Sequence, residues 1–173
     1  GYLLVAFTAN PGDGIATACF YIAAYTAMNF GAFAVITHVA GYNESVRTID
    51  DYIGLAQKRP VLAALFAFFL ISLVGIPFTG GFFGKFLVFA ATLHAGHVWL
   101  AVIGLLNSGL ACFYYLRLLS ALYTRSAPGN EPVVAAPRVI GIPACLALAA
   151  SAIVTLCLGV FPTPVLNLAR RAA

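Results

Sequence analysis

The residue whose surroundings point most clearly to chemistry is a lysine inside an apolar segment. Lys85 follows the helix-breaking residues 75–81 and precedes the apolar run 86–91. A lysine at the centre of a membrane helix costs about 2.5–3.5 kcal/mol on insertion scales, so such residues usually face an interior cavity and belong to an ion pathway. We therefore expect Lys85 to bind and release a proton. The alternative is that its long stem carries the amine to the membrane surface.

Polar side chains in two neighbouring apolar segments could extend a proton path from this lysine. In the first segment a polar residue recurs every four positions, which places the set on one helix face: Thr17, Tyr21, Tyr25 and Asn29. In the second segment the candidates are Asn107, Ser108, Tyr114 and Tyr115. Hydroxyl and amide groups in a row can hold water and pass protons, or they can simply hydrogen-bond to neighbouring helices.

Two further hydroxyl groups flank the helix-breaking cluster. Ser72 and Thr79 are placed to hydrogen-bond the backbone groups that a broken helix leaves unpaired. With Lys85 as the proton relay, the predicted polar axis consists of Tyr21, Tyr25, Asn29, Ser72, Thr79, Ser108 and Tyr115.

The apolar segments contain no acidic residue that could balance the charge of Lys85. The counter-charge is therefore expected from preceding residues or from another subunit, unless the lysine is neutral for much of the time. The chain opens within an apolar stretch and without Met, so we expect residues to precede it in the whole protein.

The composition places these residues in a membrane. Of the 173 residues, 62% are hydrophobic and 8% are charged, whereas soluble domains carry about 25% charged residues. A surface with so few charges is stable in lipid rather than in water. Most of the basic residues behind the net charge of +4 lie between or beyond the apolar runs, which is the pattern that sets membrane orientation rather than nucleic-acid binding.

The cysteines give no sign of a redox or metal centre. The chain has 4 cysteines, scattered through apolar segments without a C-x-x-C pair. This spacing predicts neither a disulfide framework nor an iron–sulfur or zinc site. We therefore expect no cofactor and no metal in this chain.

Apolar runs and helix breakers divide the chain into membrane crossings, each needing about 20 residues for a hydrocarbon core of roughly 30 Å. Residues 1–9 are expected to end one helix, and residues 10–14 to form a turn. Complete crossings are expected at residues 15–40, 98–122 and 139–161. Polar loops are expected at residues 41–59, where a short amphipathic helix is one option, and at 123–138. A basic tail with two prolines follows the last crossing.

Residues 60–95 are too long for one straight crossing and short for two. They form either a hairpin of two helices or a single crossing that is broken near mid-membrane. Non-helical backbone at that depth requires protein or a watery cavity to satisfy its polar groups. A single crossing puts both basic loops on one side of the membrane, so the positive-inside tendency favours the broken helix with cytoplasmic loops. The basic tail then lies on the opposite side.

Three stretches together resemble subunit N of respiratory complex I, the proton-pumping NADH:quinone oxidoreductase. They are FYIAAYTAMNFGAF (20–33), IDDYIGLAQKRPVLAALFAFFLISLVGIPFTGGFFGKFLVF (49–89) and LNSGLACFYYLRLL (106–119). The resemblance covers most of residues 1–125, as the C-terminal part of that subunit. Residues 126–173 match only as a loop and a final transmembrane helix.

The resemblance implies an all-α, polytopic transmembrane bundle with one discontinuous helix, which is half of an antiporter-like inverted-repeat fold. It places Lys85 on the proton-channel lysine of the second repeat. The related subunit M has Glu at this position, and the GLAQKRP loop favours N over L. The first repeat is absent from this sequence, so the fragment alone is not expected to pump.

The same resemblance implies a role in a larger enzyme. NADH, FMN, iron–sulfur clusters and quinone would be bound by other subunits, and the partners would be membrane subunits such as M, K, J and A-type neighbours. The expected location is the bacterial inner (plasma) membrane, as a multi-pass protein. The nearest alternative is a subunit of a related cation/proton antiporter or membrane-bound hydrogenase. An alternative of another class is a structural membrane scaffold, in which Lys85 reaches the membrane surface.

Overall fold

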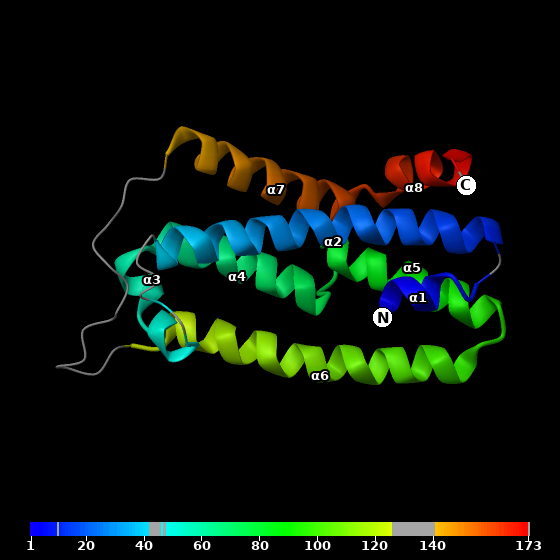
Figure 1. Ribbon diagram of the computed structural model, residues 1–173, viewed down its shortest axis with the longest axis horizontal. Coiled ribbons are helices and arrows are strands. Elements are labelled where there is room, and N and C mark those ends of the chain that lie inside the picture. The colour runs from blue at the N-terminus through cyan, green and yellow to red at the C-terminus, as the bar shows by residue number, and fades with distance from the viewer. Residues whose placement is uncertain (10, 42–45, 47, 126–140, 173) are drawn as a thin grey trace.

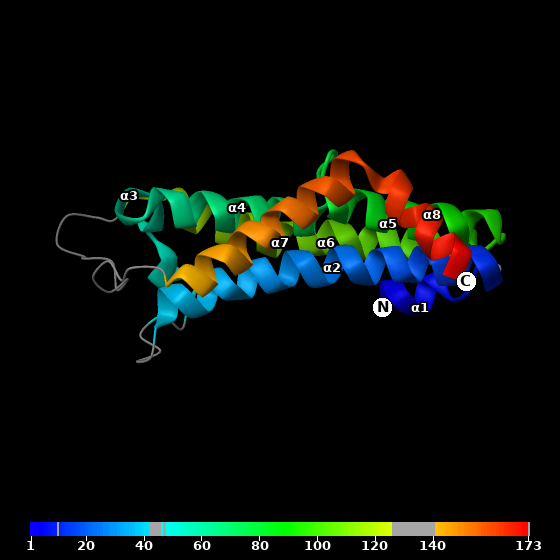
Figure 2. The same ribbon diagram turned by 90° about the horizontal axis from the view of Figure 1, so that it is seen from above.

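A computed structural model describes all residues except 10, 42–45, 47, 126–140 and 173, and every regular element in the described part is a helix (Figure 1). The long elements lie side by side along one direction, and the views of Figures 1 and 2 agree on this. In chain order the described helices are α1 (Tyr2–Ala6), α2 (Pro11–Ala40), η1 (Asp50–Tyr52), α3 (Leu55–Lys58), α4 (Pro60–Val74), α5 (Gly80–His94), α6 (Val98–Tyr123), α7 (Ile142–Val160) and α8 (Pro162–Ala172).

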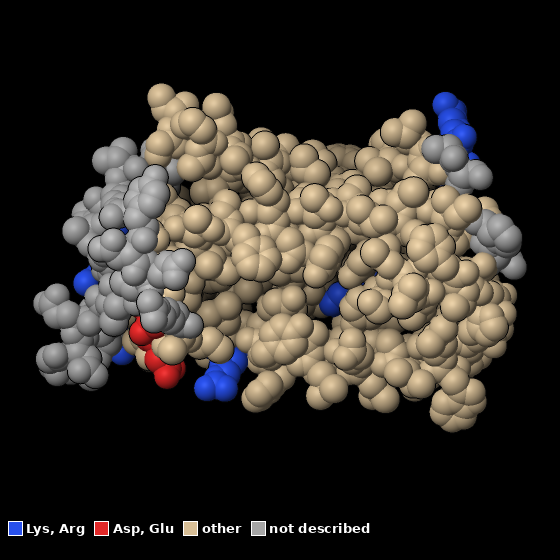
Figure 3. Space-filling view, viewed as in Figure 1, with Lys and Arg blue, Asp and Glu red and all other residues tan. Residues whose placement is uncertain are grey.

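Among the described residues, three helices are long and apolar enough to cross a membrane: α6, α7 and the Gly12–Ala40 part of α2. The predicted crossings at 15–40, 98–122 and 139–161 are thus confirmed within a few residues at their ends. On the face shown in Figure 3, the charged side chains lie mostly toward the ends of the bundle, and most of the surface between them is uncharged. This distribution suits a bundle whose middle faces lipid, because charges are tolerated only near the membrane surface.

The segment 60–95 is a single broken crossing, as the charge pattern predicted. α4 and α5 follow one another in the same direction and together run the length of α2 and α6 (Figure 1). α4 ends at Val74, and the next residue, Gly75, has a φ of +95°. Glycine adopts this left-handed conformation readily because it has no Cβ. α5 begins after Thr79, whose backbone is extended.

The predicted turn at residues 10–14 is wrong for its described part. α2 already begins at Pro11, so residues 11–14 form its first turn, while Asn10 lies outside the described residues. Proline fits the first helical position because the N–H that it lacks has no partner there. Gly14 also has a packing role, since a Cβ at this position would lie 2.7 Å from the carbonyl oxygen of Ala6.

The tail after the last predicted crossing is helical. α8 begins at Pro162 and also contains Pro164 in its first turn, where proline costs no intrahelical hydrogen bond. Val165 and Leu166 pack against the apolar core, and α8 lies on α2 in Figures 1 and 2. No secondary structure was predicted for this tail, because proline in the first turn of a helix cannot be distinguished by residue type alone from proline in a loop.

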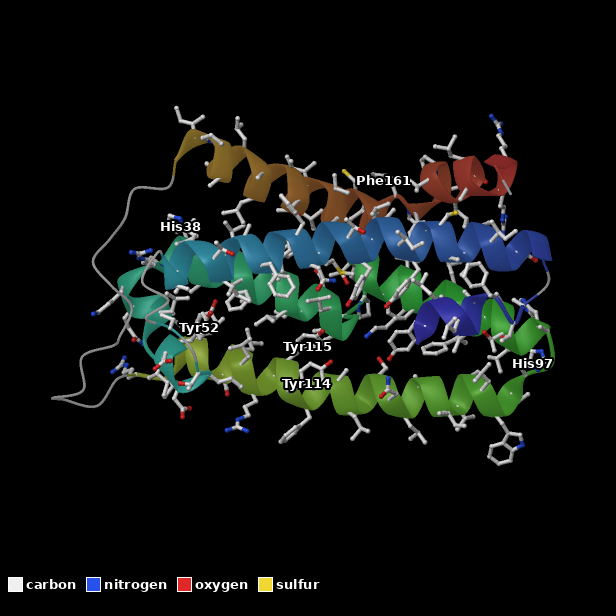
Figure 4. All side chains as sticks on the ribbon, in the orientation of Figure 1. His38, Tyr52, His97, Tyr114, Tyr115 and Phe161 are labelled. Atoms are coloured by element: carbon white, nitrogen blue, oxygen red, sulfur yellow. The ribbon has the colours of Figure 1, made fainter. Side chains whose placement is uncertain are left out.

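The polar loop at 41–59 contains the short helices η1 and α3 in its described part. Tyr52 and Leu55 are buried and join the apolar core, so this end of the bundle is capped by apolar side chains of the loop. The loop and the end of α6 lie at the same end of the molecule, and His97 lies at the opposite end (Figure 4). Most of the predicted loop at 123–138 lies outside the described residues.

A close contact between α2 and α4 joins a glycine to a buried phenylalanine. The ring of Phe69, which is fully buried, occupies the space that a Cβ on Gly31 would need. We expect Gly31→Ala to destabilise the protein by about 1–3 kcal/mol, the usual cost of overpacking. Thermal unfolding of the purified membrane protein measures this cost. Gly12→Ala is the matched control, because nothing lies within 4 Å of the added methyl group.

Candidate functional site

The amine of Lys85 lies at the break between α4 and α5, and it is bound to the end of α4. Nζ donates hydrogen bonds to the carbonyl oxygens of Leu73 at 2.9 Å and Val74 at 3.0 Å. The last four carbonyls of a helix have no intrahelical partner, and together they carry about half a negative charge. The lysine therefore provides positive charge and hydrogen-bond donors where the broken helix lacks both. This position inside the bundle argues against the alternative in which the long stem of Lys85 carries its amine to the membrane surface.

Two other elements contact the same amine. On α6, the hydroxyl oxygen of Ser108 accepts a third hydrogen bond from Lys85 Nζ at 3.0 Å. The ring of Tyr2 on α1 lies with its centroid 5.7 Å from Nζ, within the range of about 6 Å at which an aromatic face attracts a cation. The ammonium form of Lys85 is thus held by helices α1, α4 and α6.

Glycines around the lysine allow the helices to approach this closely. A Cβ on Gly81 would collide with the carbonyl oxygen of Ser72 on α4, and a Cβ on Gly84 would lie 3.3 Å from the ring of Tyr21 on α2. The glycines of the GGFFGK stretch therefore face different neighbours. Their spacing brings α5, and with it Lys85, against the end of α4.

The two hydroxyl groups predicted to stabilise the break behave differently. The Thr79 hydroxyl donates to the carbonyl oxygen of Ile76 at 2.7 Å, so it closes the loop between the half-helices. Ser72 is fully buried, and its hydroxyl has no hydrogen-bond partner among the described groups. The expected role in pairing freed backbone groups thus fits Thr79 and not Ser72.

A cavity of about 310 Å³ adjoins the lysine. Its polar lining comes from several helices: Tyr2, Tyr21, Tyr25, Lys85, Asn107, Tyr114 and Tyr115. At about 30 Å³ for each water molecule, such a space has room for roughly ten. Figure 4 shows Tyr114 and Tyr115 near the middle of α6, at the depth of the break. The arrangement can exchange protons between a lysine and a chain of water and hydroxyl groups.

Most of the predicted polar axis meets at this cavity. Tyr21, Tyr25 and Tyr115 line it, and Ser108 binds the lysine. Asn29 does not line it: its side-chain amide donates to the carbonyl oxygen of Tyr25 on its own helix at 2.8 Å. The four-residue spacing placed Asn29 on the correct helix face but one turn beyond the cavity.

Tyr2 is the contact of Lys85 that the sequence did not reveal. Its ring packs edge-on against Phe89 at 5.8 Å between centroids and lies 5.9 Å from the ring of Tyr21. The two residues are far apart in sequence, and a tyrosine at the start of an apolar stretch gives no signal of such a contact. Only the packing of α1 against α5 brings them together.

The described residues that line this cavity include no carboxylate. Throughout the described part of the chain, no three His, Cys, Asp or Glu side chains are placed to hold a metal ion. Among the described residues, the negative partner of Lys85 is therefore the end of α4 rather than an acidic side chain.

Residues 1–111, which include Lys85 and its contacts, match the family described as "NADH:quinone oxidoreductase/Mrp antiporter, TM". The chain belongs to the NADH:quinone oxidoreductase/Mrp antiporter family. With three long apolar helices in its described part and the broken crossing, it is a multi-pass membrane protein of that family.

Similar proteins within the NADH:quinone oxidoreductase/Mrp antiporter family are about three times as long as this chain. NADH-quinone oxidoreductase subunit N 1 of Solibacter usitatus (strain Ellin6076) is 46% identical over 173 residues, which is 100% of this chain and 35% of the relative. The chain therefore spans about a third of the length of the curated relatives it matches.

Two solved structures share the fold. Respiratory complex I from Thermus thermophilus with bound aureothin has a chain that is 29% identical, with a TM-score of 0.75, covering 96% of this chain and 36% of that one. The Mrp complex from Dietzia sp. DQ12-45-1b has a chain with a TM-score of 0.82 and 24% identity, covering 99% of this chain and 39% of that one. At that identity the second likeness shows the fold alone, and it confirms the antiporter-like bundle.

Proposed function

We propose that this chain is the C-terminal part of a subunit N of NADH-quinone oxidoreductase, and that Lys85 relays protons through the membrane. Electron transfer from NADH to quinone in other subunits would drive this movement. The observation that carries the proposal is the amine of Lys85 at a helix break inside the bundle, bound to the carbonyl oxygens of Leu73 and Val74 beside a cavity lined with hydroxyl groups.

The contacts of Lys85 suggest how the relay works. The ammonium form has three acceptors within 3.0 Å and an aromatic face, so it is held at the break. When the proton leaves, the neutral amine loses charge-assisted hydrogen bonds and the attraction of the helix end. Water in the cavity and the hydroxyl groups of Tyr21, Tyr25 and Tyr115 would take up that proton and return one. Any change in charge near the cavity would then shift the balance between the two forms.

The proposal places the other parts of the machinery outside this chain. A carboxylate that balances Lys85 would come from the remaining two thirds of the subunit or from a neighbour, such as membrane subunits M, K, J or A. NADH, FMN, iron–sulfur clusters and quinone would be bound elsewhere in the complex. The membrane would be the bacterial inner membrane, with the end that carries Arg59 and Arg125 in the cytoplasm. Residues 1–125 would be the proton-translocating part, and residues 126–173 a loop and closing helix.

The alternative of a cation/proton antiporter subunit has one observation in its favour, the fold shared with the Mrp complex. The two functions predict different responses of membrane vesicles. For a subunit N, deletion of the subunit abolishes NADH-driven, quinone-dependent acidification of inverted vesicles. A proton flux driven by a sodium gradient is unaffected. The opposite pattern, with loss of sodium-driven flux only, would reject the assignment to NADH-quinone oxidoreductase.

The hydroxyl group of Ser108 gives a smaller test of the same site. In Ser108→Ala, Lys85 keeps both carbonyl acceptors but loses the one on α6. Hydrogen bonds to charged groups contribute about 1.5–3 kcal/mol, part of which water in the cavity can replace. We therefore expect protons translocated per NADH to fall several-fold, with a normal amount of assembled complex. Ser108→Thr, which keeps the hydroxyl, serves as the control, and equal losses in both variants would contradict this role.

A further inference from the structure

The last turn of α7 fits directly against the break that carries the lysine site. A Cβ on Gly159 would collide with backbone atoms of Phe78 and Thr79, in the loop between α4 and α5. Conversely, a Cβ on Gly80 would lie 3.2 Å from both Leu158 Cβ and the carbonyl oxygen of Thr155. At this contact, α7 thus places Gly159 against the loop, and α5 places Gly80 against α7. A second helix break follows immediately, since α7 ends at Val160 and Phe161 lies between α7 and α8 (Figure 4).

The face of α7 that makes this contact is anchored on α2. Its buried residues recur at helical spacing: Leu148, Ser151, Thr155, Leu158 and Gly159. The hydroxyl of Ser151 donates to the carbonyl oxygen of Ala27 on α2. One turn later, the hydroxyl of Thr155 donates to the backbone carbonyl oxygen of Ser151 at 2.8 Å. α7 is therefore bound to the long helix α2 at Ser151, two turns before the turn that touches the loop.

The loop itself has a backbone conformation that needs such support. Phe78 has a φ of +70°, which is uncommon for a residue with a bulky side chain. Its side chain is 76% exposed and gives little packing that would hold this conformation. Backbone in such a conformation persists only where the surrounding structure determines it. Here Gly159 packs against the carbonyl group of Phe78 itself.

We propose that the last turn of α7 is a positioning element for Lys85, and that Gly159 is its central residue. By fixing the loop 75–79, it fixes the carbonyl groups of Leu73 and Val74 on one side and the start of α5, with Lys85, on the other. This inference rests on the proposed function of Lys85. It assigns a role to a helix beyond the family match, which ends at residue 111.

The test compares single substitutions in the whole complex. Gly159→Ala would push the loop away from α7 and so separate the amine from its acceptors. We expect protons translocated per NADH to fall at least threefold at an equal amount of assembled complex. Gly109→Ala on α6 is the matched control, because nothing lies within 4 Å of its added methyl group. Leu158→Ala, which removes atoms from the same contact, is expected to lower the ratio in the same direction even if Gly159→Ala does not assemble.

A second comparison separates positioning from a general structural role. If α7 acts through the lysine, Gly159→Ala causes no further loss of proton translocation in a Lys85→Ala background. Two results would overturn the inference. One is that Gly159→Ala translocates as many protons per NADH as Gly109→Ala does. The other is that Gly159→Ala causes a further loss in the Lys85→Ala background. Normal translocation by Lys85→Ala would instead reject the proposed function of the lysine.

Discussion

Replacing Lys85 with alanine is expected to lower NADH-driven proton translocation by at least tenfold while the complex still assembles. The ammonium group is held by the end of α4 and by Ser108, and alanine removes the only lysine among the described residues that line the cavity. A positioned group that gives and takes protons typically contributes about 10²–10⁴-fold to a rate. The measurement is acidification of inverted membrane vesicles per NADH oxidised. It is normalised to the amount of complex in the membrane.

Three further variants identify which property of Lys85 matters. Lys85→Arg keeps a positive charge but does not release its proton, so a relay is expected to fail in this variant as well. Lys85→Leu removes the charge and keeps the bulk, and normal translocation by it would favour a purely structural role. Lys58→Ala, at the end of the bundle, is the matched lysine control and is expected to leave translocation unchanged.

The break and its lysine could be predicted from the sequence because the signals are local. Glycines and a proline within an apolar run predict a broken helix, and a lysine ten residues after Gly75 must lie close to that break. The charges of the flanking loops then favour one crossing over two. The four-residue spacing of Tyr21 and Tyr25 predicted a common face, and both residues line the same cavity.

The remaining contacts depend on packing between distant segments. Tyr2 reaches Lys85 only because α1 lies against α5, and α7 reaches the break only because α2 holds it there. No local pattern distinguishes Gly159, which faces backbone, from Gly109, which faces open space. Likewise, Pro162 and Pro164 indicate the end of a helix or its first turn equally well, so α8 was missed.

The glycines that precede Lys85 give the second large effect, and Gly81→Ala is expected to be the most damaging of them. Its methyl group would overlap the carbonyl oxygen of Ser72 and lie 3.0 Å from the sulfur of Met28. Overpacking usually costs about 1–3 kcal/mol, and backbone atoms can yield less than side chains can. We therefore expect less assembled complex, a lower thermal midpoint of the purified complex, and loss of proton translocation in what remains.

A graded series distinguishes this clash from a general effect of replacing glycine. Gly84→Ala meets the ring of Tyr21 at 3.3 Å, so a small shift of that ring accommodates it, whereas Gly109→Ala meets nothing within 4 Å. Alanine favours a helix over glycine by about 1 kcal/mol, so helix propensity alone would make all three variants more stable. A loss that is largest at Gly81, smaller at Gly84 and absent at Gly109 therefore follows only from the spacing between α5 and its neighbours. Equal losses at all three positions would show that the close approach of α5 to α4 does not hold Lys85 at the break.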